Sequence, residues 1–148
     1  MPYLSVDTFL ARYLDADEAR QLLGQNADGE VPAQGRETAE LAIERAGMEL
    51  NSRLAPRYPV PVPHPPAELE DAVGALARRR LYTFSPPESV TQEAERVRAY
   101  LDEAGQGVRQ IHGLSPAATP PAGASGAGLR GRADREMTRE TLWSDPWK

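Results

Sequence analysis

Apolar residues recur every three to four positions along three long stretches of the chain, which is the spacing of amphipathic α-helices. The stretches span residues 36–55, 66–84 and 89–111. In each stretch the apolar residues form a stripe along one side of the predicted helix. The last residues of the three stripes are Leu54, Phe84 and Ile111, and Val108 also belongs to the third stripe. The residues predicted to pack the core or a subunit contact are Leu50, Leu54, Leu69, Val73, Leu76, Leu81, Val97 and Leu101. The pattern predicts an all-α fold built on a bundle of three long helices.

Two short helices are predicted before the first long one. Ser5 is a typical N-cap residue and precedes an apolar stripe, while Asp15 and Asp17 can cap a second helix that Gly24 ends. Residues 25–35 contain Asn, Asp, Gly and Pro, which favour turns, so an exposed loop is predicted there. The short helices are expected to pack across the bundle.

The starts of the later helices also carry local signals. Pro66 is predicted to occupy the first turn of the second long helix, where its missing N–H costs nothing. Ser89 and Gln92 have the spacing of a capping box, which predicts the start of the third. Gly74 lies inside the second long helix, and its low helix propensity indicates close packing at that point.

A proline-rich segment separates the first two long helices. It consists of Pro56, Arg57, Tyr58, Pro59, Val60, Pro61, Val62, Pro63, His64, Pro65 and Pro66, and it holds six of the fourteen prolines. Proline fixes φ and removes a hydrogen-bond donor, so residues 58–66 are predicted to be extended, close to polyproline II. Two interpretations stay open: a rigid connection between helices, or a ligand for an aromatic groove on another protein.

The C-terminal part of the sequence differs in composition. Residues 113–128 are Gly, Ala, Pro, Ser and Thr except for Leu114, which predicts a flexible linker after a helical domain of residues 1–112. Residues 129–148 contain both tryptophans, and the residues expected to anchor this arm are Leu142, Trp143, Pro146 and Trp147. The arm is expected to bind another subunit; the alternative is that it folds back onto its own bundle.

Composition narrows the classes of function. The net charge is −5, and residues 1–64 carry ten acidic residues against six arginines, which disfavours general binding to nucleic acid. The run Arg78–Arg80 is expected to be solvated or paired with Glu68, Glu70 or Asp71. There is no cysteine, and no nucleophile, phosphate-loop or dinucleotide motif occurs. We therefore expect no enzyme activity, no cofactor and no metal, and neither a signal peptide nor a membrane span is expected.

The order of these features resembles a known family. Residues 1–7 open the chain as Met-x-Tyr-Leu-Ser-Val-Asp, and residues 54–61 read Leu-x-x-Arg-Tyr-Pro-x-Pro, followed by helical patterns at 69–84 and 93–100. Over about residues 1–112 the chain is similar to the Mu-like phage family of small head-to-tail connector (neck, or adaptor) proteins. The stretch at 54–61 is the most specific part of this resemblance.

The resemblance implies an all-α structural protein in the virion neck, made in the host cytoplasm. Its implied partners are the portal protein, a tail-side neck or stopper protein, and other copies in a ring of twelve. Genome DNA would pass through the ring without sequence-specific binding, and the arm would dock on the portal or on a neighbouring copy. A non-virion helical interaction module that uses the proline segment and the arm is the alternative. A helical DNA-binding protein using Arg78–Arg80 is a third class, which the acidic charge disfavours.

Overall fold

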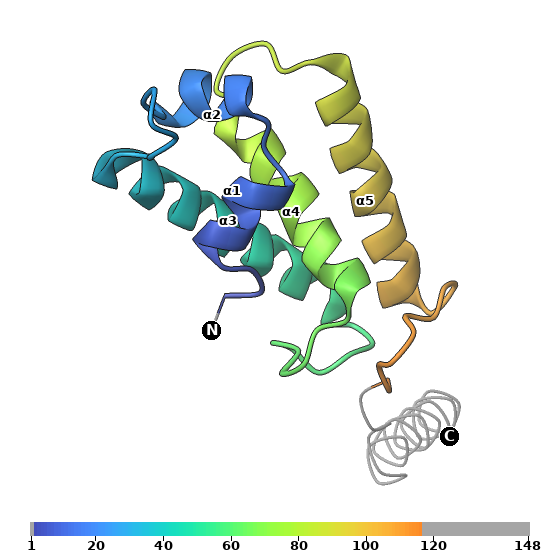
Figure 1. Ribbon diagram of the computed structural model, residues 1–148. Coiled ribbons are helices and arrows are strands. Elements are labelled where there is room, and N and C mark those ends of the chain that lie inside the picture. The colour runs from blue at the N-terminus through green and yellow to red at the C-terminus, as the bar shows by residue number, and fades with distance from the viewer. Residues whose placement is uncertain (1, 117–148) are drawn as a thin grey trace, which may run out of the picture. The chain divides into compact units, whose positions relative to one another are not determined.

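The computed structural model describes residues 2–116, and within them the chain forms five α-helices and no strand. The helices are α1 (Val6–Arg12), α2 (Ala16–Leu23), α3 (Ala33–Leu54), α4 (Ala67–Leu81) and α5 (Glu88–Gln106) (Figure 1). The predicted all-α class, with three long helices preceded by two short ones, is confirmed. The described residues belong to one compact unit.

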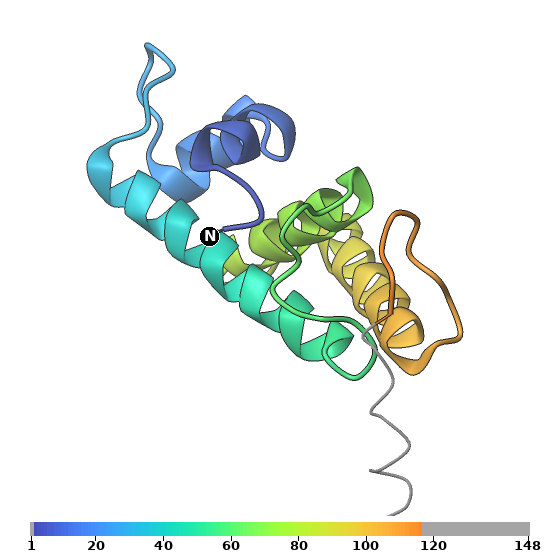
Figure 2. The same ribbon diagram turned by 90° about the horizontal axis from the view of Figure 1, so that it is seen from below.

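Helix α4 lies between α3 and α5, and this position explains its composition (Figures 1 and 2). A helix covered on two sides needs a wide apolar surface rather than a single stripe. Eight of its fifteen residues are buried: Leu69, Ala72, Val73, Gly74, Ala75, Leu76, Ala77 and Leu81. The short helices α1 and α2 pack against α3, and the aromatic ring of Tyr13, just after α1, also contacts α4.

Most of the residues predicted to pack are in this core. Leu50, Leu54, Leu69, Val73, Leu76 and Leu101 are fully buried, Leu81 is nearly so, and Val97 is partly buried against them. Phe84 and Val108 were predicted on the same stripes but are exposed. The reason is that both helices end before these residues: α4 ends at Leu81 and is followed by extended backbone at Tyr82, and α5 ends at Gln106 and is followed by Gly107 in a left-handed conformation.

The helix ends partly follow the sequence signals. The predicted caps at Ser5, Asp15 and Gly24 are confirmed, and Asp15 also forms a capping box with Glu18. Asp17, the other predicted cap of this helix, lies in its first turn. The predicted capping box at Ser89 is wrong, because α5 begins at Glu88 with Pro87 in the N-cap position and Gln92 donates its side-chain hydrogen bond to Glu88.

Two other boundaries shift at prolines. Helix α3 begins at Ala33 rather than at residue 36, directly after Pro32. Pro66 is the N-cap of α4 rather than part of its first turn. In both places a proline precedes the first helical residue and has no capping side chain. Its backbone carbonyl accepts a helical hydrogen bond instead: Pro32 accepts from the N–H of Arg36, and Pro66 accepts from the N–H of Glu70. A search for polar capping side chains therefore misses these starts.

Glycines allow two close approaches between segments distant in sequence. A Cβ at Gly74 would lie 2.5 Å from the ring of Tyr13, so the tight packing predicted at this glycine is confirmed. A Cβ at Gly105 would lie 2.1 Å from the carbonyl oxygen of Arg53, so the C-terminal ends of α3 and α5 meet with no room for a side chain.

A largely buried carboxylate, Glu49 of α3, joins the three long helices. It accepts hydrogen bonds from Arg53 at 3.2 Å, from Arg80 of α4 at 2.9 Å and from Arg98 of α5 at 2.7 Å. Arg53 also donates to both oxygens of Asp102 on α5 at 2.7 Å. Burial alone would raise the pKa of Glu49, but the hydrogen bonds from Arg98 and Arg80 outweigh it and lower the pKa below its ordinary 4.5.

A second buried carboxylate, Glu18, ties α2 to the end of α4. Arg78 donates two hydrogen bonds of 2.8 Å to it, and the hydroxyl of Tyr82 donates a third at 2.7 Å. Burial and this hydrogen bond raise the pKa of Tyr82 to about 12, because an ionised phenolate would face the Glu18 carboxylate. The arginine run was predicted to be solvated or paired with Glu68, Glu70 or Asp71, and the predicted partners are wrong. Arg78 pairs with Glu18 and Glu93, and Arg80 pairs with Glu49, whereas Arg79 forms no ion pair within residues 2–116.

Tyrosine hydroxyls bridge further elements. Tyr13 donates to Asp71 of α4 at 2.5 Å, and burial together with this bond raises its pKa to about 12. Tyr100 of α5 donates to Glu68 of α4 at 2.6 Å, and its pKa is raised for the same two reasons. These bonds fix the positions of the helices along one another, which apolar packing alone does not specify.

Replacing Leu76 by Asp is expected to unfold the helical unit. Leu76 is fully buried at the centre of α4, and an unpaired carboxylate there costs several kcal/mol. Circular dichroism and thermal unfolding would measure the loss. Phe84→Asp is the control, because Phe84 is 88% exposed and its replacement should leave the unfolding temperature unchanged. Equal effects of the two variants would contradict this core.

Replacing Glu49 by Gln is expected to lower the free energy of unfolding by about 2 kcal/mol, because three arginines lose their shared charged acceptor. Since the folded pKa of Glu49 is lowered, its ionic contribution is present above the unfolded pKa and is lost as the pH falls below 4.5. Urea unfolding at neutral pH and at acid pH measures both effects, and the difference between wild type and variant should shrink in acid. Glu44→Gln, at an exposed site of α3, is the matched control.

Candidate assembly surfaces

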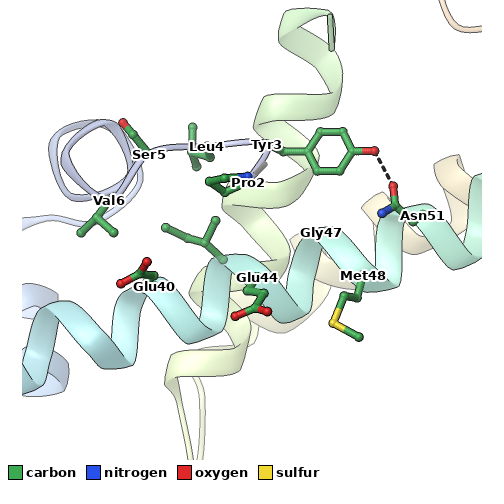
Figure 3. Close-up of a pocket in the computed structure, with 11 residues that line it drawn as sticks. Pro2, Tyr3, Leu4, Ser5, Val6, Glu40, Glu44, Gly47, Met48 and Asn51 are labelled. Atoms are coloured by element: carbon green, nitrogen blue, oxygen red, sulfur yellow. Dashed lines mark hydrogen bonds between the residues drawn. The ribbon is translucent and has the colours of Figure 1, made fainter. Parts of the chain in front are cut away.

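The N-terminal segment, residues 2–6, covers part of α3 and forms a groove with it, which we call the acidic groove. Its lining residues are Pro2, Tyr3, Leu4, Ser5, Val6, Glu40, Ile43, Glu44, Gly47, Met48 and Asn51, and its volume is about 380 Å³ (Figure 3). Glu40 and Glu44 are exposed on α3, and Met48 is 63% exposed beside them. The acidic groove therefore combines accessible apolar surface with two carboxylates.

Tyr3 holds the N-terminal segment in place. Its hydroxyl donates to the side-chain oxygen of Asn51 on α3, as Figure 3 shows, and accepts the backbone N–H of Val62 at 2.9 Å. Its ring packs over Gly47, where a Cβ would lie 3.2 Å away. Burial raises the pKa of Tyr3, against the opposing hydrogen bond from Val62. One side chain thus ties the acidic groove to the proline-rich segment.

A second groove lies between α3, the end of α4 and α5, and we call it the arginine groove. It is lined by Thr38, Leu41, Ala42, Arg45, Arg79, Arg80, Leu81, Tyr82, Thr83 and Arg98, and its volume is about 400 Å³. Glu49 holds Arg80 and Arg98, and Arg79 donates to the carbonyl of Tyr82 at 3.4 Å. Within residues 2–116, Arg45 and Arg79 form no ion pair. The groove carries more positive charge than the local carboxylates balance.

The two grooves occupy different sides of the same helix. Successive residues of an α-helix point about 100° apart, so the neighbours Glu44 and Arg45 face different directions. Glu44 lines the acidic groove and Arg45 the arginine groove. The exposed apolar residues Met48 (63% exposed) and Leu41 (44% exposed) are seven positions apart, so they lie about 20° apart on the helix, along the boundary between the two grooves. Helix α3 thus carries acidic residues on one side of this boundary and Arg45 on the other.

The proline-rich segment is not extended throughout residues 58–66, which differs from the prediction. The backbone bends at residues 58, 60–61 and 63–64. Tyr58 is 1% exposed and its hydroxyl accepts the N–H of Ile111 at 3.3 Å, while Val62 is buried next to Tyr3. These two anchors draw the segment onto the bundle. The prolines point outward: Pro56, Pro59, Pro61 and Pro63 are exposed, and Pro65 and Pro66 are half-buried.

The remaining predicted site lies beyond the described residues. Leu142, Trp143, Pro146 and Trp147, together with most of the predicted linker, fall in residues 117–148, outside the described part of the chain.

Sequence reasoning missed both grooves. A usable signal was present, because Leu41 and Met48 interrupt the polar face of α3 next to residues of opposite charge. What the pattern could not supply was the position of the N-terminal segment, which builds one wall of the acidic groove.

Metal and membrane chemistry can be checked for residues 2–116. Within this range no three His, Asp or Glu side chains come together as a metal site would require. No helix of the same range is long and apolar enough to span a bilayer. His64 and His112 are both exposed.

A comparison with known protein families identifies a match for this chain. The family model described as Bacteriophage Mu, Gp36 matches residues 3–128, which include all five helices and the proline-rich segment. No curated protein matches the sequence. Because the match spans well over half of the chain, this protein belongs to the Bacteriophage Mu Gp36 family and is a phage protein.

Proposed function

We propose that this protein is a structural subunit of the phage head-to-tail connector. In this proposal, copies of the chain form a ring beneath the portal, extend its DNA channel and provide the surface on which the tail docks. The family match over residues 3–128 carries the proposal, because it identifies a phage protein and includes the Leu-x-x-Arg-Tyr-Pro-x-Pro stretch at 54–61. The proposed location is the virion neck, after synthesis in the host cytoplasm.

Features of the helical unit support a structural role. Two buried carboxylates and the tyrosine hydroxyls brace the helices against one another, so the unit can bear contacts without rearranging. The N-terminal segment and the proline-rich segment are both tied to the core through Tyr3. A ring subunit needs such fixed surfaces, because a small error in angle is repeated at every contact.

The proposed partners are the portal protein above the ring, a tail-side neck or stopper protein below it, and other copies of this chain, twelve in all. Genome DNA would pass without sequence-specific binding, and the net charge of −5 supports this part of the proposal because it disfavours general retention of phosphates. No enzyme activity, cofactor or membrane contact is part of the proposed function.

Phage lacking this protein should assemble heads but fail to join them to tails. Electron microscopy of the lysate would count the separate heads and tails, and mass spectrometry of purified wild-type particles should detect the chain. Supplying the protein from a plasmid should restore complete particles. If particles without the protein retain DNA and carry tails, the connector function is wrong.

Removing residues 137–148 should prevent attachment to the neck while leaving the helical unit as stable as before. The two tryptophans in this range each offer on the order of 200 Å² of surface, enough to anchor a protein contact. Pull-down with portal-bearing heads measures attachment, and thermal unfolding measures stability. The substitution Thr138→Ala in the same range is the control. A large loss of stability in the truncated monomer would show instead that the arm folds onto its own bundle.

A further inference from the structure

The arginine groove differs in charge from other hollows of the described residues. Its lining holds four arginines, Arg45, Arg79, Arg80 and Arg98, and no carboxylate. Four further hollows, among them the acidic groove, each have at least two carboxylates in their lining. In a chain of net charge −5, the arginine groove is therefore a local concentration of positive charge.

The fold balances only part of this charge. Within residues 2–116, the four arginines have one carboxylate partner, Glu49, which pairs with Arg80 and Arg98. Arg45 and Arg79 form no ion pair in the same range. The groove thus carries an excess of three positive charges. Like charges held close together repel one another, so an anion in the groove would be bound favourably.

Arg80 and Arg98 also keep hydrogen-bond donors available for a ligand. A guanidinium group has five N–H donors in a fixed plane. Arg98 uses its Nε and Arg80 uses one terminal nitrogen to bind Glu49, and neither side chain makes another hydrogen bond within residues 2–116. The side chains are 35% exposed for Arg80 and 33% for Arg98. Glu49 therefore holds both guanidinium groups in position, while their remaining N–H groups can bind an anion.

We infer that the arginine groove binds the phosphate group of a small molecule, which is either inorganic phosphate or a phosphate monoester. Guanidinium groups match phosphate oxygens through paired, charge-assisted hydrogen bonds. The volume of about 400 Å³ is in the range of small-molecule sites, and the apolar residues Leu41, Ala42 and Leu81 also line the groove. This binding activity goes beyond the connector function and does not depend on it.

The charges outside the groove favour a small anion over a polyanion. DNA binding draws its affinity from several phosphates contacted at once. Helices α3 and α5 carry exposed carboxylates that do not line the groove, including Glu37, Glu44 and Glu95. These carboxylates would repel the further phosphates of DNA, and they would repel a long acidic peptide for the same reason. A small anion needs only the groove itself.

Calorimetric titration of the full-length protein with inorganic phosphate and with phenyl phosphate tests the site. Sodium chloride keeps the ionic strength equal throughout. Binding should saturate, and phosphate should raise the unfolding temperature above its value in chloride, because a ligand that binds only the folded state stabilises it. Tighter binding of phenyl phosphate would identify an ester as the ligand, whereas equal or weaker binding would identify inorganic phosphate.

Two variants assign the binding to the groove. Arg45→Gln and, separately, Arg79→Gln should each weaken phosphate binding at least about tenfold, because each removes a charged donor. Arg45→Gln should leave the unfolding temperature in chloride unchanged, since Arg45 forms no ion pair in the described residues. Arg96→Gln is the matched control: Arg96 is exposed, lies two positions before Arg98 on α5, and lines a different hollow. This control should bind phosphate as the wild type does.

The inference is wrong if phosphate neither binds nor stabilises the protein beyond chloride, or if Arg96→Gln weakens binding as much as Arg45→Gln. It is also wrong if a hexaglutamate peptide or a short DNA duplex binds more tightly than both phosphate compounds and loses affinity in Arg45→Gln. The groove would then belong to an acidic protein segment or to nucleic acid. These measurements use purified protein, whereas the connector function is tested on phage particles, so either can fail while the other stands.

Discussion

The burial of α4 between α3 and α5 is the constraint on which the other features depend. A fifteen-residue helix covered on two sides gains most of its stability from apolar packing, and its buried residues are mainly alanine, valine and leucine. Such small side chains let the neighbouring helices come close. They do little to fix how far one helix is shifted along another, or how it is rotated about its own axis. The polar bonds at the edges of this core supply that information: Glu49 and Glu18 hold arginines of α4, and Tyr13 and Tyr100 hold its acidic residues.

These polar bonds cost little because they lie at the edge of the core. Glu49, which accepts hydrogen bonds from three arginines, remains charged, as its lowered pKa indicates, and Arg80 and Arg98 stay partly in contact with water. The desolvation cost is therefore smaller than for an ion pair at the centre. The same arrangement holds Arg80 and Arg98 as one wall of the arginine groove, so the bracing of the fold and the shape of its surface have one origin.

The sequence predicted the helices well because helical periodicity and local capping act over a few residues. Ser5, Asp15 and Gly24 marked ends correctly, and the stripe of α4 identified Leu76 at its centre. The helix start predicted from Ser89 was wrong, because α5 begins directly after Pro87, which has no capping side chain. The partners of Arg78 and Arg80 could not be predicted, since Glu18 and Glu49 lie about 30 to 60 residues away and meet them only after the helices pack. The grooves depend on the same long-range packing.

The two faces of α3 alternate within the same turns: positions 38, 41, 42 and 45 belong to one groove, and 40, 43, 44, 47, 48 and 51 to the other. No loop separates them, so no insertion or deletion in a connection can change the angle between them. That angle is set by the covalent geometry of an unbroken helix, which is among the stiffest elements a protein has. The relative orientation of the two grooves along α3 is therefore a property of the helix itself.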